Sequence, residues 1–193
     1  MRPRKLIFVT GLLFVSCVSE DPVPPIADLD YQLFCDRGSG CNGLVNEPKH
    51  RVERGIDGQD GFRIYCSAGE KISDLNLSLV QTGYAISIRG ESSAKSQKCS
   101  LRVEEGNNTY EKSCIISKGG NADCSEEASR EFSENVADMP CQVSVVKDGS
   151  TVSGTACCRN IPLEYRQALG NEFSLVSSQD FTKPASFDFE NCN

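Results

Sequence analysis

Residues 99–114, which read CSLRVEEGNNTYEKSC, give the clearest indication of how this chain folds. The first half alternates apolar and polar residues, and a glycine-containing turn and a second cysteine follow. This period of two predicts a β-strand with one buried face. Pairing Val103 with Tyr110 across the turn places Cys99 opposite Cys114. Directly opposed residues lie within disulfide reach, so we expect a hairpin closed by a Cys99–Cys114 bond.

A second segment repeats this pattern. It begins CQVSVVKDG at Cys141 and ends in the neighbouring pair Cys157-Cys158. Cys141 is expected opposite Cys157 or Cys158, because a shift of one residue in the loop exchanges the two. Neighbouring strand residues point to opposite faces, so we expect the pair to bond two different partners; a redox-active vicinal disulfide is the alternative. The repeat is either a duplicated β unit or a coincidence.

Further strands are expected on both sides of these hairpins. Alternation over 62–66, 75–79 and 84–88, with Thr82-Gly83 as a turn, predicts strands and a hairpin at 74–89. Late strands are expected at 172–176 and 185–189. Two short helices are expected, one from Asp123 or Ser125 to Asp138 and one from Pro162 to Leu169 before Gly170. The predicted fold is therefore all-β: a disulfide-crosslinked β-sandwich of Cys-closed hairpins with one or two short helices.

The segment from Tyr31 to Gly61 is expected to contain little regular structure, except near Leu33-Phe34. Its glycine-rich loop between Cys35 and Cys41 predicts a local disulfide. The basic stretch PKHRVER, with the only histidine, is interpreted as a loop, and DGQDG at 57–61 as a turn.

The N-terminus has the features of an export signal. Arg2, Arg4 and Lys5 precede the apolar run LIFVTGLLFV at 6–15. Ten residues are too few to span a bilayer but suit the core of a signal peptide. We therefore expect residues 1–16 to be a signal peptide.

The end of this signal, Phe14-Val15-Ser16-Cys17, resembles the lipobox of bacterial lipoproteins, although Phe14 stands where the family most often has Leu. The resemblance implies cleavage before Cys17 and attachment of diacylglycerol and a further acyl chain such as palmitate. Each buried CH₂ contributes about 0.8 kcal/mol, so two or three chains give stable anchoring. Val18, in place of the Asp that retains lipoproteins in the inner membrane, favours the outer membrane. The alternative is an ordinary secretory signal cut after Cys17 or Ser19.

The remaining sequence predicts a tether followed by one domain. Residues 17–30 contain SEDPVPPIADLD, whose prolines and acids predict an extended, lipid-anchored tether. Residues 31–193 are expected to form a single Cys-rich β domain.

The number of cysteines and the net charge indicate an exported protein and argue against a nucleic-acid-binding one. Eleven cysteines in 193 residues indicate an oxidising compartment. Setting Cys17 aside leaves an even number for disulfides: Cys35, Cys41, Cys66, Cys99, Cys114, Cys124, Cys141, Cys157, Cys158 and Cys192. Cys192 is expected to fix the C-terminus. The net charge of −7, or −10 without residues 1–16, argues against a nucleic-acid partner.

Candidate catalytic or metal-binding residues are few. His50 is expected to be a solvated loop residue, without an evident nucleophile or orienting partner. Asp57 and Gln59 fit the start of a calcium loop, but Gly61 stands where a ligand is needed, so a plain turn is favoured. Glu104-Glu105 is interpreted as solvating charge rather than a glycosidase pair. Zinc is not expected without a Cys-x-x-Cys or a histidine pair. We therefore predict no catalytic residues, metal or cofactor.

The sequence thus predicts a bacterial envelope lipoprotein, held at the outer membrane by its lipid, with a non-catalytic binding or structural domain outside the cytoplasm. Its ligand, a protein or a glycan, is not specified. One alternative is a secreted, unanchored disulfide-rich effector or inhibitor. The other is an envelope hydrolase that acts on glycan or peptide, which requires an acidic cleft.

Overall fold

The computed structural model describes residues 22–37, 49–91, 97–106, 108–124, 140–162, 172–176 and 183–193. Within them the regular structure is β apart from one 3-10 turn, η2 (Ile72–Asp74), so the predicted all-β class is confirmed. The strands are β1 (Ile26–Arg37), β2 (Lys49–Ile56), β3 (Arg63–Ser67), β4 (Asn76–Gln81), β5 (Tyr84–Gly90), β6 (Lys98–Glu105), β7 (Asn108–Lys118), β8 (Cys141–Asp148), β9 (Thr151–Pro162), β10 (Glu172–Val176) and β11 (Ala185–Glu190).

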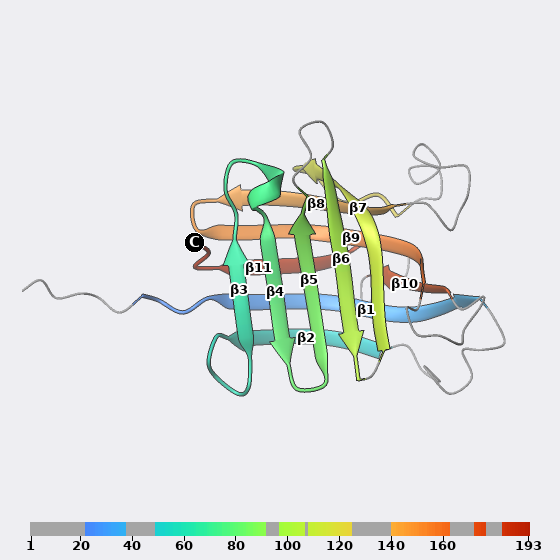
Figure 1. The fold of residues 1–193 in the computed structure, drawn as a ribbon, viewed down its shortest axis with the longest axis horizontal. Coiled ribbons are helices and arrows are strands. Elements are labelled where there is room, and N and C mark those ends of the chain that lie inside the picture. The colour runs from blue at the N-terminus through green and yellow to red at the C-terminus, as the bar shows by residue number, and fades with distance from the viewer. Residues whose placement is uncertain are drawn as a thin grey trace, which may run out of the picture.

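One continuous sheet contains all of these strands. Its order is β10-β1-β11-β9-β8-β7-β6-β5-β4-β3, and β2 pairs with β1. Figure 1 shows the sheet folded into two layers, with β3 to β7 in front and the other labelled strands mostly behind, crossing them steeply. The parallel pairing of β7 with β8 carries the sheet from one layer to the other. The expected β-sandwich of Cys-closed hairpins thus takes the form of a single, nearly closed sheet folded into two layers.

The hairpin predicted at 99–114 is present in the predicted register. Val103 pairs with Tyr110 and Cys99 with Cys114, and a disulfide joins the two cysteines. The hairpin predicted at 74–89 is also present as β4 and β5, and Gly83 supplies the positive φ (89°) of its turn.

The second cysteine hairpin is formed by β8 and β9, and here the structure decides between the two pairings. Cys141 bonds Cys158, and Cys157 bonds Cys124. Cys158 belongs to the main core, whereas Cys157 packs with Cys124 in a small separate cluster. The prediction that the neighbouring cysteines have different partners on different faces is confirmed.

A fourth disulfide, Cys66–Cys192, attaches the C-terminus to β3 as expected. The four bonds account for eight of the ten cysteines assigned to disulfides. Cys17 and Cys41 lie outside the described residues, and only the backbone of Cys35 is described, within β1. The expected Cys35–Cys41 bond therefore stays a prediction.

The prediction of little regular structure between Tyr31 and Gly61 is wrong. β1 and β2 pair along eight consecutive positions in this region. Inward-facing Leu29, Tyr31 and Leu33 are almost fully buried, because the period-two pattern begins inside the segment assigned to the tether. The sheet starts at Ile26, which is five residues before the expected domain boundary at 31.

The two expected helices fall largely on residues that the structure does not describe, 125–139 and 163–171. At their edges, Asp123 lies in an irregular segment and Pro162 is the last residue of β9 rather than the first residue of a helix. The late strands are confirmed as β10 and β11. None of the helical structure in the described residues has the length and apolarity needed to span a membrane.

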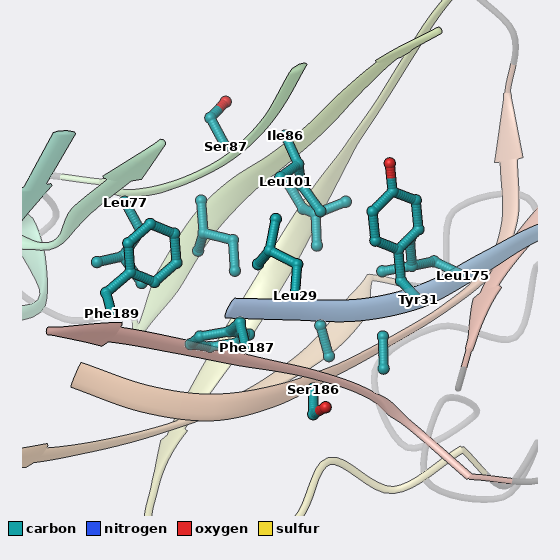
Figure 2. A pocket seen from close by; sticks show the side chains of 13 residues that line it. Leu29, Tyr31, Leu77, Ile86, Ser87, Leu101, Leu175, Ser186, Phe187 and Phe189 are labelled. Atoms are coloured by element: carbon teal, nitrogen blue, oxygen red, sulfur yellow. The ribbon is translucent and has the colours of Figure 1, made fainter. Parts of the chain in front are cut away.

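The core lies between the two layers. Figure 2 shows Leu29 and Phe189 of the back layer directed toward the front-layer side chains Leu101 and Leu77. The small cavity among them has about 20 Å³ accessible to the centre of a water molecule, enough for about one water. Because the cavity is small and its lining is largely apolar, we interpret it as a packing defect of the core rather than a ligand-binding site.

Candidate functional site

A groove of about 480 Å³ lies between the β3–β4 connection and the end of β8. Its floor is apolar, formed by Leu75, Ile116 and Val145. Its rim is charged, and carries Glu70, Lys71 and Lys147. Exposed Val146 extends the apolar surface beside the rim. We call this feature the groove.

The wall on the β3–β4 side is fixed by short-range contacts around Asp74. The Asp74 carboxylate accepts a hydrogen bond from the Lys71 amide at 3.3 Å, and its backbone carbonyl accepts one from the Ser67 hydroxyl at 3.2 Å. Gly69 packs so closely on Asp74 that a Cβ at this position would collide with its side chain. The Lys147 ammonium donates to the Ala68 carbonyl, which ties the wall to β8.

The wall on the other side is shaped by glycines that follow β7. Gly119 and Gly120 both have positive φ angles, 78° and 82°, which other residues adopt only with strain. The Gly119 amide donates to the Val145 carbonyl at 3.2 Å, and the Ser144 hydroxyl donates to the Gly120 carbonyl at 2.8 Å. Hydrogen bonds therefore fix both walls of the groove.

This arrangement suits a ligand with an apolar body and an acidic group. The size lies within the range of small-molecule sites, and an apolar lining with few polar groups is their usual composition. Two ammonium groups against one carboxylate give the rim an excess of positive charge. Lysine ammonium groups are compact charges that bind carboxylates and phosphates.

The residues weighed from the sequence as catalytic or metal-binding candidates lie elsewhere. His50 belongs to strand β2, where its backbone pairs with Gln32, and not to the expected loop; its side chain is not described. Residues 57–61 form the predicted turn, in which the Asp57 carboxylate accepts a hydrogen bond from the Ile64 amide at 2.7 Å. Asp57 thus serves as a structural acceptor. Among the described residues, no group of three or more His, Cys, Asp or Glu is placed to hold a metal ion.

The Glu104-Glu105 pair is divided between two environments, so the prediction that both are solvating charges is wrong for Glu105. Glu104 points outward and bonds Arg102 at 2.8 Å, while Glu105 is only 3% exposed. The alternation that buries Val103 also places Glu105 inside. Lys112 is buried on the same principle, at 7% exposure. Neither buried charge is without a partner.

Sequence reasoning missed the groove, because its walls come from segments about 75 residues apart. It also missed the buried charges, although Tyr110, Lys112 and Cys114 alternate along one strand and therefore share a face. Comparisons of this chain with protein-family models, curated proteins and solved structures give no match.

Proposed function

We propose that this chain is a lipid-anchored protein of a bacterial outer membrane, whose β domain is a non-catalytic binding module and whose groove is the ligand site. The groove is the observation that carries the binding role. Its apolar floor and basic rim favour an amphiphile with an acidic head group.

The disulfides support a location outside the cytoplasm. Four bonds join eight cysteines, of which seven are buried, and they connect residues up to 126 positions apart. Such bonds persist in oxidising compartments and are rare in the cytosol. Together with the resemblance to a lipobox at Cys17, they favour an exported and anchored protein over a cytosolic one.

The positions of the described carboxylates support a non-catalytic role. Asp57 is used by the turn before β3, and Glu104 by its ion pair with Arg102. A glycoside hydrolase of the usual kind needs two carboxylates facing one substrate. Glu104 and Glu105, the pair weighed for that role, do not face one site, because Glu104 points outward and Glu105 is only 3% exposed.

The anchor is tested by labelling cells with radioactive palmitate. The wild-type chain is expected to incorporate label, and Cys17→Ala is expected to incorporate none. Equal labelling of both proteins contradicts the anchor. A free N-terminus at Val18 or Glu20 in the mature protein favours the secreted effector or inhibitor.

Ligand binding is tested with dodecanoate as the probe and an uncharged dodecyl glycoside as its control. We expect saturable binding of dodecanoate by calorimetry, weaker binding of the glycoside, and loss of both in Val146→Asp. The matched control is Val80→Asp, because Val80 is another exposed strand valine (39% against 45% for Val146) away from the groove. Equal binding by the two variants contradicts the assignment of the groove.

A further inference from the structure

The two outer faces of the folded sheet carry opposite charge. The front face, defined as the outward side chains of β3 to β7, has four cations and two carboxylates: Arg63, Arg89, Lys98, Arg102, Glu104 and Glu111. Glu91 follows β5 at the edge of this face. The front face thus has a net charge of about +2 in a protein whose total charge is −7.

The front face keeps an excess of positive charge, because its two carboxylates share one arginine and three cations remain. Arg102 bonds Glu104 at 2.8 Å and Glu111 at 3.1 Å, and these bonds raise the Arg102 pKa. Within the described part of the chain, Arg63 and Arg89 make no side-chain hydrogen bond or ion pair. Two guanidinium groups are therefore available to a partner.

The back face, defined as the outward side chains of β1, β2 and β11, has the reverse balance. Its described charges are four carboxylates and one cation: Asp28, Asp30, Asp188, Glu190 and Arg54. Arg54 lies 3.2 Å from Asp28 and 3.6 Å from Glu190. Asp188 stands directly opposite Asp28 in the β1–β11 register. Partial burial, and then repulsion from Glu190 and Asp28, raise the Asp188 pKa.

Both faces also have short side chains between their charges, which leaves room for a partner to approach. Short side chains separate the charges: Ser78, Ser87 and Ser100 on the front, and Ser153 and Ser186 beside the back face. The front face adds exposed Tyr65 (56%), a residue type enriched in protein interfaces. Figure 1 places these two layers on opposite sides of the fold.

We infer that the front face of one copy docks on the back face of a second copy. Among the described residues, the front face has two guanidinium groups without an ion pair, and the back face has three more carboxylates than cations, so the two faces attract each other. Because the two faces differ, the contact is heterologous and each copy has a free face for the next one. The total negative charge opposes association, but salt screens interactions beyond about 8 Å at physiological ionic strength, and contacting groups are closer.

The test is sedimentation equilibrium of the full, disulfide-bonded chain carrying Cys17→Ala, so that no lipid contributes to association. At 0.1 M salt we expect the average mass to rise above that of a monomer with increasing concentration, and to return to it at 1 M salt. Arg89→Glu and Asp188→Arg are each expected to weaken association by roughly tenfold or more. Both residues are exposed, so circular dichroism serves as the check on folding.

The decisive sample is an equimolar mixture of these two variants. The altered back face of the Asp188→Arg variant then meets the altered front face of the Arg89→Glu variant with the charges exchanged. The two unaltered faces also remain complementary, so the mixture is expected to recover association. Asp148→Arg, at the exposed end of β8, is the matched charge reversal and is expected to associate as the parent does. A parent chain that stays monomeric at every concentration, or a mixture that does not recover, overturns the inference.

Discussion

Removing the Cys66–Cys192 disulfide is expected to destabilise the domain more than removing Cys99–Cys114. The first bond closes a chain segment of 126 residues and the second closes one of 15. The Cys99–Cys114 and Cys124–Cys157 bonds shorten the larger loop to roughly 80 residues. The chain-entropy relation then gives about 4.5 kcal/mol for Cys66–Cys192 and about 3 kcal/mol for Cys99–Cys114.

The same disulfide also holds the chain terminus against the free edge of β3. The Asn193 amide donates to the Cys66 carbonyl at 3.2 Å, and the Ala68 amide donates to the Asn193 carbonyl at 3.3 Å. β3 is the edge strand at one end of the sheet order. These hydrogen bonds therefore occupy backbone groups that would otherwise be free to pair with a strand of another molecule. Loss of Cys66–Cys192 is therefore expected to promote aggregation as well as unfolding.

The assay is urea denaturation of two double variants, Cys66→Ala/Cys192→Ala and Cys99→Ala/Cys114→Ala, against the wild type. Alanine in both pairs removes the bond without adding a buried polar group, and three of the four cysteines are almost fully buried. We expect the first variant to be less stable by about 1.5 kcal/mol than the second. Equal stability, or the reverse order, contradicts the dependence on loop length.

Three further predictions concern single side chains. Asp57→Ala leaves the Ile64 amide without its acceptor and is expected to lower stability to urea by about 1–3 kcal/mol, whereas Gln59→Ala, at an exposed position of the same turn, should have little effect. Leu101→Ala, at a fully buried position, is expected to cost about 3–5 kcal/mol in the same assay; a loss below about 1 kcal/mol contradicts the described core. The Asp188 pKa is raised on folding, so its contribution to stability falls as pH rises through the titration range. Asp188→Asn is therefore expected to raise the melting temperature at pH 7 more than at pH 3, and equal shifts at the two pH values would count against this.

The hairpins could be predicted because their determinants are local. In 99–114 the alternation fixes the faces, the turn fixes the loop, and the cysteines fix the register, all within 16 residues. The Cys141 hairpin left one alternative open, since the sequence alone does not decide a shift of one residue in the loop.

The closure of the sheet could not be predicted in the same way. β1 pairs with β10 and β11, whose residues follow it by more than 130 positions, and β7 reaches β8 only across a long connection. Such pairings depend on the complementarity of whole faces rather than on any short motif. The strand β1 itself was detectable, because Ala27, Leu29, Tyr31 and Leu33 alternate, but the adjacent prolines and acids favoured a tether.

The groove has no sequence signal for the same physical reason. Leu75, Ile116 and Val145 are ordinary apolar strand or strand-end residues, and only their meeting in the fold makes a floor. The burial of Glu105 could not be predicted, because two adjacent acids beside a glycine turn resemble the solvated tip of a hairpin.

The intact mass of the native protein, alkylated without prior reduction, tests the anchor and the crosslinked fold together. An envelope lipoprotein crosslinked as described is expected to begin at Cys17 with its acyl chains attached, and to take up no alkylating reagent. A mass that retains residues 1–16, or that includes alkylated cysteines, contradicts this assignment.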